Sequence, residues 1–237
     1  MKKKGVTFYF NSEIKSVEKL KKNFRIKFDK KTNSKSVKTK VVFNTSGRVP
    51  AIELLAVEKA NIKNDETGII VNDYLVNATN KNVYACGDVS SKSLPLTPLS
   101  GLQGYIVGHN ILKENSKKFS NPLVPSVVFT HPNLASVGMS EEEAKKTYKN
   151  VKIYKGDASH FYNAKKSNEK VYAYKILVNE RTETLVGAHL LSTEANECIN
   201  ILMLAINQKM TVSEFKKLIF TYPSYASDLK SMMKNID

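Results

Sequence analysis

Cysteine is scarce in this chain, and the two thiols present are not arranged as a site. Cys86 and Cys198 are the only cysteines in 237 residues, and neither belongs to a CxxC or CxxxxC pair. A disulfide scaffold or a thiolate zinc site is therefore not expected, and both cysteines are predicted to be buried as small apolar side chains. The four histidines show no HxxxH or HExxH spacing, so no metal site is predicted.

Long apolar segments are also missing. No run approaches the roughly 18 consecutive apolar residues that a membrane-spanning helix needs. The lysine-rich start, Met1 to Gly5, is not followed by the apolar stretch of a signal peptide. We therefore expect a soluble cytoplasmic protein without a membrane anchor.

Acidic residues are few compared with basic ones, and the formal net charge is +15. Most of this excess lies in residues 1–40, which hold thirteen lysines and one arginine against three acidic residues. Recognition of bases and phosphates favours the planar fork of arginine, but the whole chain has only three arginines. No aromatic stacking motif lies among the lysines either. A solvated lysine-rich surface is therefore preferred to a nucleic-acid interface.

Apolar and polar residues alternate in the N-terminal part of the chain. Period-two alternation between turn residues predicts a short antiparallel meander with one polar side. Asn44–Pro50 ends this pattern with a glycine and a proline, which mark a crossing between elements. The alternating segments are Val6–Phe10, Glu13–Val17, Phe24–Phe28 and Val37–Phe43.

A long helix is predicted from Leu96 to Glu114, with Thr97 as its N-cap and Pro98 at its first position. Its predicted apolar stripe consists of Leu99, Leu102, Ile106 and Leu112. Before it, a short helix is expected at Ile52–Val57 and strands at Gly68–Val71 and Asn82–Cys86.

After a predicted linker at Lys117–Val124, the pattern indicates a module of strands and helices. Capping boxes predict helix starts at Ser140–Glu143 and at Thr211–Glu214, because each Ser or Thr is followed three residues later by a glutamate. Another helix is predicted at Glu194–Gln208. The predicted strands are Ser126–Thr130, Val151–Tyr154, Tyr172–Val178 and Leu185–Leu191.

Chemistry is indicated where the strand Asn82–Cys86 runs into Gly87-Asp88. Glycine lets a ligand approach the backbone, and aspartate offers acceptors to sugar-like hydroxyls. The helix that begins at Leu96-Thr97 adds unpaired N–H groups and a positive dipole end, which favour anionic groups. Each feature alone is more typical of an ordinary turn or helix start.

Together with the segment Val124–Ala144, these motifs resemble the second half of a pyridine nucleotide-disulfide oxidoreductase. The resemblance implies an α/β and α+β fold: remnants of the NAD(P)- and FAD-binding domains, followed by an α+β FAD/NAD-linked reductase dimerisation domain. It divides the chain into the closing β-meander of the NAD(P) domain (1–44), the C-terminal half of the FAD domain (45–121) and the dimerisation domain (122–237).

The resemblance also implies roles for individual residues. Gly87 and Asp88 would contact the ribityl chain of FAD, and the helix end at Leu96 and Thr97 would face the flavin ring. Tyr222 stands where glutathione reductase has the histidine of a His–Glu pair that does acid–base work across the dimer interface, and Ser227 stands at the glutamate position. A tyrosine hydroxyl ordinarily ionises near pH 10, so it shuttles protons poorly at neutral pH. Packing at the dimer interface is an equally good interpretation of Tyr222.

The motifs of the family's first half are absent: the GxGxxG of the FAD pyrophosphate, the CxxxxC redox pair and the second glycine motif. The chain is therefore expected to be the C-terminal part of a homodimeric enzyme that passes hydride from NAD(P)H through FAD to a disulfide or another acceptor. Alone, it is expected to dimerise through residues 122–237, to hold FAD weakly and to be inactive. The alternatives are a non-catalytic interaction protein and a nucleic-acid-binding protein that uses the basic N-terminal arm.

Overall fold

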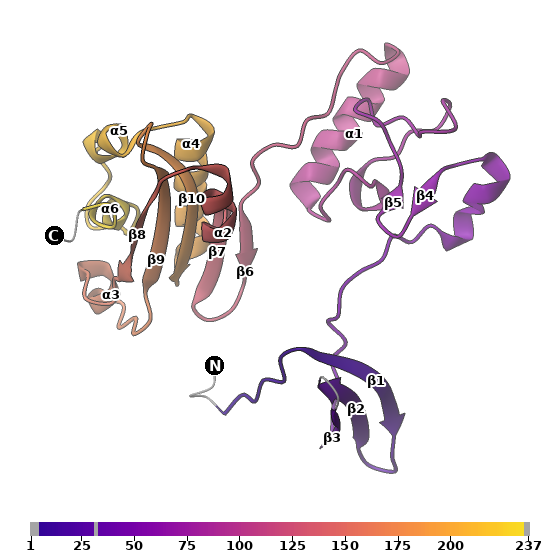
Figure 1. The fold of residues 1–237 in the computed structure, drawn as a ribbon, viewed down its shortest axis with the longest axis horizontal. Coiled ribbons are helices and arrows are strands. Elements are labelled where there is room, and N and C mark those ends of the chain that lie inside the picture. Colours follow the sequence, from indigo (N-terminus) through magenta and orange to yellow (C-terminus); the bar gives the residue numbers. More distant parts are fainter. Residues whose placement is uncertain (1–4, 31–32, 235–237) are drawn as a thin grey trace. The chain divides into compact units, whose positions relative to one another are not determined.

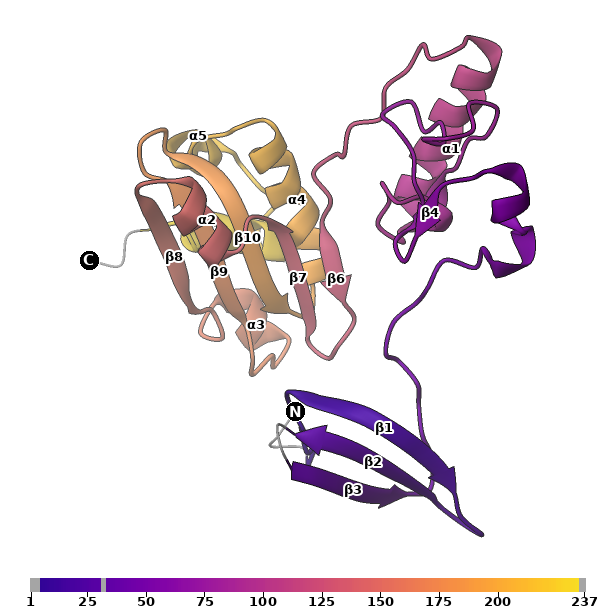
Figure 2. The ribbon, with the colours of Figure 1, turned by 45° about the vertical axis from the view of Figure 1, so that its right-hand side comes forward.

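The computed structural model describes residues 5–30 and 33–234 and divides the chain into two compact units, Met1–Phe119 and Ser120–Asp237. Figures 1 and 2 show the elements of each unit. In unit 1 they are β1 (Ser12–Lys19), β2 (Phe24–Lys30), β3 (Asn33–Thr39), η2 (Glu53–Leu55), η3 (Val57–Ala60), β4 (Asn64–Asp65), β5 (Gly68–Ile69), η4 (Gly87–Val89) and α1 (Thr97–Leu112).

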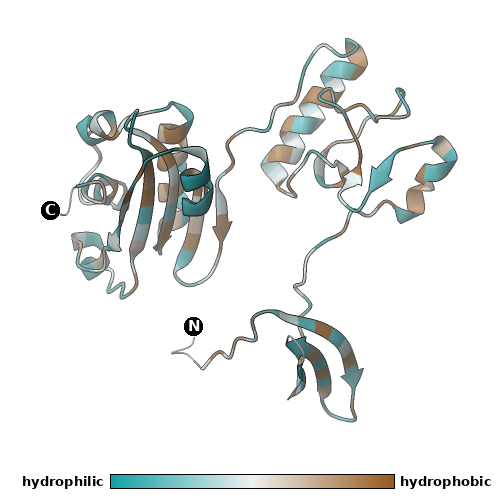
Figure 3. Cartoon of the chain, in the orientation of Figure 1, coloured by the Kyte–Doolittle hydropathy of each residue, from teal (hydrophilic) through white to brown (hydrophobic). Residues whose placement is uncertain are grey.

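The strands β1, β2 and β3 form the predicted antiparallel meander. Val17, Ile26 and Val37 lie side by side across the three strands, which places one apolar row on one face. Figure 3 shows the resulting alternation of hydrophilic and hydrophobic residues along the strands. The strand predicted at Val6–Phe10 is wrong: that segment has no ladder partner, although the ring of Tyr9 packs on that of Phe28 at 4.8 Å.

Residues 44–96 form less regular structure than the sequence predicts. The helix expected at Ile52–Val57 is two 3-10 turns, because Ala56 adopts a left-handed conformation with φ of 46° between them. The strand expected at Asn82–Cys86 is a loop that touches its neighbour through a single bridge between Val76 and Tyr84. Hydrogen bonds from side chains to the backbone take the place of the missing strand-to-strand hydrogen bonds in this segment.

Asn77 is the centre of these bonds, and its side chain is buried. Its amide nitrogen donates to the carbonyl oxygens of Lys63 at 3.0 Å and Ile70 at 2.8 Å. Its amide oxygen accepts from the backbone N–H groups of Thr79 and Asn80 at 3.2 and 3.0 Å. One polar side chain thereby satisfies backbone groups that would otherwise be buried without partners.

Unit 2 contains one five-stranded antiparallel sheet in the order β6-β7-β10-β9-β8, with helices against it (Figure 1). All four strand pairs are antiparallel. Its elements are β6 (Ser126–Val128), β7 (Asn133–Gly138), α2 (Glu141–Thr147), β8 (Val151–Asp157), α3 (Tyr162–Lys166), β9 (Ala173–Asn179), β10 (Thr184–Ser192), α4 (Ala195–Asn207), α5 (Val212–Lys217) and α6 (Tyr225–Ser231).

The sheet of unit 2 is covered on both faces. Helix α4 packs across β7 and β10 (Figure 2), and with α5 and α6 it buries the main core around Ile176, Leu202 and Phe215. On the opposite face, Ala144 of α2 packs on Leu177 and Val186. Successive residues of β9 therefore point into different cores, as the period of a strand requires.

Both predicted capping boxes are confirmed, at Ser140 with Glu143 and at Thr211 with Glu214. The strands predicted in the second half are also present with shifted ends. The sequence did not predict β7, which lies in the interior of the sheet, or α3.

Candidate functional site

The predicted residues Gly87 and Asp88 lie in the turn η4, which packs against the first turns of α1. The N–H of Gly87 donates to Oε1 of Gln103 at 2.8 Å, and Gly87 has φ of 72°, a region that favours glycine. A Cβ added there would lie 3.2 Å from Oγ of Ser100. Glycine is thus favoured by the backbone conformation, and a side chain here would also displace Ser100 of α1 slightly.

Asp88 presents an exposed carboxylate beside this contact. Its Oδ1 accepts a hydrogen bond from Oγ of Ser100 at 3.3 Å, which links it to α1. A carboxylate has several acceptor positions, so most of its capacity is still available to hydroxyl groups from outside. Asp88 is therefore positioned by the protein and open to a ligand.

Helix α1 begins one residue earlier than the capping pattern indicated. Leu96 is the N-cap, so the prediction of Thr97 as N-cap is wrong, and Thr97 and Pro98 are the first two helical residues. The leucine side chain cannot accept a hydrogen bond, and the structure shows no side-chain cap. The first turn thus keeps its positive dipole end without the side-chain oxygen that usually neutralises it.

Gly87, Asp88, Leu96 and Thr97 are all at this end of α1, because the hydroxyl of Ser100 lies near Asp88 Oδ1 and Leu96 O. The arrangement combines an acceptor carboxylate, a close backbone approach and an uncapped helix end. Its chemistry suits a ligand that carries both hydroxyl groups and partial negative charge, as a flavin does. These observations are consistent with the predicted site, and Asp88 and Thr97 are exposed as contact with a ligand requires.

Two polar residues of α1 were missed. Gln103 and Asn110 are both fully buried and lie on the same face as Leu99 and Ile106. Asn110 donates to the carbonyl oxygens of Tyr74 and Lys117 at 2.9 and 2.8 Å, and Gln103 holds Gly87. Their helical spacing from Leu99 was the signal in the sequence.

The predicted apolar stripe of α1 was partly wrong. Leu99 and Ile106 are buried, but Leu102 and Leu112 are 41% and 86% exposed. The buried stripe is completed by polar side chains, so apolar residues are left on the outer side.

Tyr222 belongs to unit 2, and its side chain is 73% exposed. Its ring lies 6.1 Å from the ring of Tyr162, measured between centroids. Ser224 caps α6, and Ser227, at the family's glutamate position, completes the capping box: its N–H donates to Oγ of Ser224 at 3.1 Å and its Oγ donates to the Ser224 carbonyl at 2.6 Å. Ser227 is therefore engaged in helix capping.

Asp228 follows Ser227 but points into the protein. It is 8% exposed, and both carboxylate oxygens accept from Nδ2 of Asn163 at 3.1 Å. Burial raises the pKa of Asp228 above its ordinary value, and the bonds from Asn163 oppose that rise. Asp228 joins α3 to α6 and is not presented to solvent as a proton carrier.

The two cysteines are both free. Cys198 is buried as predicted, and burial raises the pKa of its thiol to about 12, so it is an unreactive apolar side chain. Cys86 is half-buried, which departs from the prediction of full burial. In residues 5–30 and 33–234, no group of three or more His, Cys, Asp or Glu could hold a metal ion.

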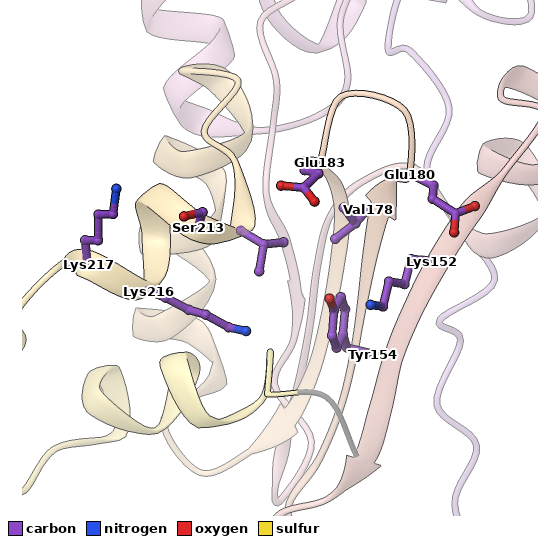
Figure 4. A pocket seen from close by; sticks show the side chains of 9 residues that line it. Lys152, Tyr154, Val178, Glu180, Glu183, Ser213, Lys216 and Lys217 are labelled. Carbon is purple, nitrogen blue, oxygen red and sulfur yellow. The ribbon is translucent and has the colours of Figure 1, made fainter. Parts of the chain in front are cut away.

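A separate cleft of about 540 Å³ lies in unit 2 between α5 and the strands β8 and β9. Figure 4 shows lysines from α5 and β8 and two glutamates around it. Charges of both signs line the cleft, so it favours no single class of ligand. Its lining consists of Lys152, Tyr154, Val178, Glu180, Glu183, Val212, Ser213, Lys216 and Lys217.

Family models match almost the whole chain. The model for pyridine nucleotide-disulphide oxidoreductase matches residues 1–104, and the model for the dimerisation domain of pyridine nucleotide-disulphide oxidoreductase matches residues 124–233. None of the helices in the described part of the chain is long and apolar enough to cross a membrane.

Individual relatives are similar over different extents. An uncharacterised 19.7 kDa protein in a mercuric resistance operon of Staphylococcus aureus is 45% identical over 75% of this chain and 99% of its own length. Mercuric reductase of Staphylococcus aureus is 30% identical over 95% of this chain and 40% of its own length. The Cu(II) complex of a mutant of RclA, an HOCl-induced flavoprotein disulfide reductase from Escherichia coli, matches with a TM-score of 0.88 at 25% identity, over 100% of this chain and 53% of that chain. The chain thus spans about half of the length of the two named enzymes.

Proposed function

The chain belongs to the pyridine nucleotide-disulphide oxidoreductase family, and on that premise we propose that it supplies half of a flavin site joined to a self-association domain. In the assembled enzyme, hydride would pass from NAD(P)H through FAD to an electron acceptor. FAD, when bound, supplies the redox chemistry, and this chain positions it. Residues 122–237 would form the homodimer, residues 45–121 would complete the FAD domain and residues 1–44 the NAD(P) domain.

The observation that carries the proposal is the contact between η4 and α1. Asp88 would accept hydrogen bonds from the ribityl hydroxyls, while Gly87 would let the cofactor approach the backbone. The uncapped end of α1 at Leu96 and Thr97 would stabilise negative charge on the flavin ring. Gln103 and Ser100 are positioning residues, because they hold Gly87 and Asp88.

Dimerisation is supported by the apolar surface of unit 2. We define the Leu218–Tyr222 segment as the exposed stretch between α5 and α6, in which Ile219 is 95% exposed and Tyr222 is 73% exposed. Large apolar side chains that are this exposed and this close in sequence favour a protein partner. A second copy of unit 2 is the proposed partner, and Tyr222 would then lie at the interface.

The electron acceptor is proposed to be one that takes up no proton from the Tyr222 position. Reducing a disulfide to two thiols consumes two electrons and two protons, whereas reducing a divalent metal ion to the metal consumes two electrons alone. Tyr222 replaces the family histidine, and Ser227 is engaged in capping α6. These two positions thus supply no proton carrier for a disulfide, whereas a metal-ion acceptor such as mercury, which the names of two relatives mention, needs none.

Flavin retention tests the proposed site. The chain is fused behind the amino-terminal part of the Staphylococcus aureus mercuric reductase, the part that precedes the segment similar to this chain. Flavin absorbance per purified chain is then compared for the fusion, for Asp88→Ala and for Glu66→Ala, which removes an exposed carboxylate elsewhere in unit 1.

We expect at least a roughly tenfold loss of FAD affinity for Asp88→Ala, because a buried set of ribityl hydroxyls loses its acceptor. Glu66→Ala should bind FAD as the parent fusion does. Equal FAD affinity in all three proteins would contradict the role of Asp88, and a fusion without any flavin would contradict the proposed function itself.

A further inference from the structure

Helix α1 contains no charged residue. Its sixteen residues, Thr97 to Leu112, include no Asp, Glu, Lys or Arg, although 25% of the whole chain is charged. A helix on the surface of a protein normally carries charged or polar residues on its outer face, and a helix without them is normally covered on every side. The composition of α1 therefore predicts a second covered face.

The structure shows that α1 is covered on one face only. Leu99, Gln103, Ile106 and Asn110 are buried against the rest of unit 1. The opposite side is exposed, with Tyr105 at 59%, Ile111 at 63% and Leu112 at 86% exposure. We call the residues on this side the glycine face: Gly101, Gly104, Tyr105, Gly108 and Leu112.

The three glycines of this face have no structural reason within unit 1. A Cβ added at Gly101, Gly104 or Gly108 meets no atom within 4 Å, and none of the three has a positive φ. Each glycine costs an exposed helix roughly 0.5–1 kcal/mol relative to alanine. A row of glycines at helical spacing does, however, allow another backbone to pack closely against the helix.

We propose that the glycine face is the docking surface for the polypeptide that carries the remainder of this flavin-binding fold. This inference rests on the proposed function. The RclA chain has the same fold over 100% of this chain, but this chain covers only 53% of it, so a polypeptide of comparable size completes that molecule. That polypeptide is the occupant to which the exposed, uncharged and closely approachable face of α1 is suited.

Other occupants fit the face less well. A lipid-binding helix carries lysines or arginines along its polar face, whereas α1 has lysines only beyond its C-terminal end, where Nζ of Lys117 donates to the hydroxyl of Tyr105 at 3.0 Å. A second copy of the chain already has a candidate contact in the Leu218–Tyr222 segment of unit 2. Binding of the chain to anionic lipid vesicles would overturn the inference, as would a second copy on the glycine face.

A tryptophan reporter measures docking directly, because the chain contains no tryptophan. Tyr105→Trp places a single indole on the glycine face. This variant is mixed with a separately expressed amino-terminal part of the Staphylococcus aureus mercuric reductase in which any tryptophan has been replaced by phenylalanine, with FAD present. We expect a complex of the two polypeptides, a blue shift of the indole emission and protection of the indole from a soluble quencher.

Gly108→Leu tests close packing without touching the flavin site, since residue 108 lies about three turns from Thr97. The free chain accepts the leucine because the space around Gly108 is open. Lys149→Leu is the matched control, since it adds the same side chain at an exposed position of unit 2. We expect Gly108→Leu to weaken the complex at least tenfold and Lys149→Leu to leave its affinity unchanged.

Each outcome has one meaning. A complex that binds FAD but tolerates Gly108→Leu and leaves the indole of Tyr105→Trp exposed overturns the glycine face as docking surface, while the proposed function stands. Failure to form a complex, with the fused enzyme still binding FAD, also overturns the inference alone. If Gly108→Leu instead converts a dimer of the free chain into a monomer, the occupant is a second copy and the inference is wrong.

Discussion

The two units of this chain bury their apolar side chains to very different extents. Within the part of the chain that the structure describes, twenty-four buried apolar residues lie in unit 2 and ten in unit 1, although the units are nearly equal in length. The exposed large apolar residues show the reverse, with nine in unit 2 and seventeen in unit 1. Unit 2 thus has the core of an independent domain, and unit 1 has surfaces suited to further packing.

This difference shows which function each unit could have on its own. Unit 2 covers its sheet with α4 on one face and α2 on the other, so its core is complete within the single chain. Unit 1 holds Gly87 and Asp88 firmly on α1 but leaves the glycine face uncovered. One half of a cofactor-binding domain is expected to combine these two features: fixed candidate binding residues and an apolar surface that nothing covers.

Cutting the chain between Phe119 and Ser120 should reveal the largest difference between the two units, in the cooperativity of their unfolding. Residues 120–237 alone are expected to unfold in one cooperative transition, because their core is complete. Residues 1–119 alone are expected to show a shallow transition with a low m-value, because they bury little apolar surface. Urea titrations followed by circular dichroism measure both transitions, and equal cooperativity of the two pieces would show that unit 1 also has a complete core.

Truncating one leucine in each unit should give the next largest difference. Leu202 is 0% exposed in α4, so Leu202→Ala should lower the free energy of unfolding of unit 2 by about 2–5 kcal/mol. Leu112 is 86% exposed in α1, so Leu112→Ala should change stability by less than about 0.5 kcal/mol. A large loss on truncating Leu112 in the free chain would show that the glycine face is already covered.

The helix caps should have a smaller effect, confined to unit 2. Ser140 and Thr211 each accept a backbone N–H at 3.2 Å and complete capping boxes. Replacing either by alanine should cost about 1 kcal/mol in thermal or urea unfolding. Leu96→Ala is the matched control in α1, because Leu96 makes no side-chain cap hydrogen bond. It should therefore lower the free energy of unfolding by less than Ser140→Ala or Thr211→Ala does.

The smallest expected effect is a pH dependence from His189 in β10. Its Nε2 donates to the Met139 carbonyl at 3.2 Å and its Nδ1 lies 3.0 Å from Oγ of Ser136, while burial lowers its pKa below the ordinary value of about 6.5. The unfolded chain then binds more protons than the folded chain as the pH falls below about 7, so stability decreases in that direction.

Replacing His189 with glutamine should remove this part of the pH dependence while keeping a side chain that can hydrogen-bond. The free energy of unfolding of residues 120–237, measured between about pH 7.5 and pH 5, should fall less steeply for His189→Gln than for the parent. Identical slopes of the free energy of unfolding against pH would show that His189 does not contribute to the pH dependence.

The sequence predicted the parts of the fold that depend on neighbouring residues. The meander follows from alternation, and α2 and α5 begin where Ser140 and Thr211 face a glutamate three residues on. Strand β7 was missed because it is built of small residues such as Ala135 and is specified by pairing with β10, about fifty residues away. The bond between Asn163 and Asp228 is likewise set by tertiary packing.

For the candidate site, the sequence indicated the residues but not how they are held. Gly87-Asp88 and Leu96-Thr97 were recognisable as motifs, and the structure brings them to one end of α1. Gln103 was overlooked because polar residues are not expected in a buried stripe, and Leu96 was not predicted as the N-cap because leucine is a poor N-cap. Both exceptions lie beside the candidate site, and departures from local sequence rules are expected at functional sites.

Sedimentation equilibrium of the whole chain distinguishes the two proposed partners: a second copy of the chain for unit 2, and a different polypeptide for unit 1. We predict a dimer for the parent chain and for Gly108→Leu, and a monomer for Ile219→Asp, which places a charge on a side chain that is 95% exposed in the single chain. A monomeric parent chain, or a dimer that survives Ile219→Asp and is lost with Gly108→Leu, would contradict this assignment of partners.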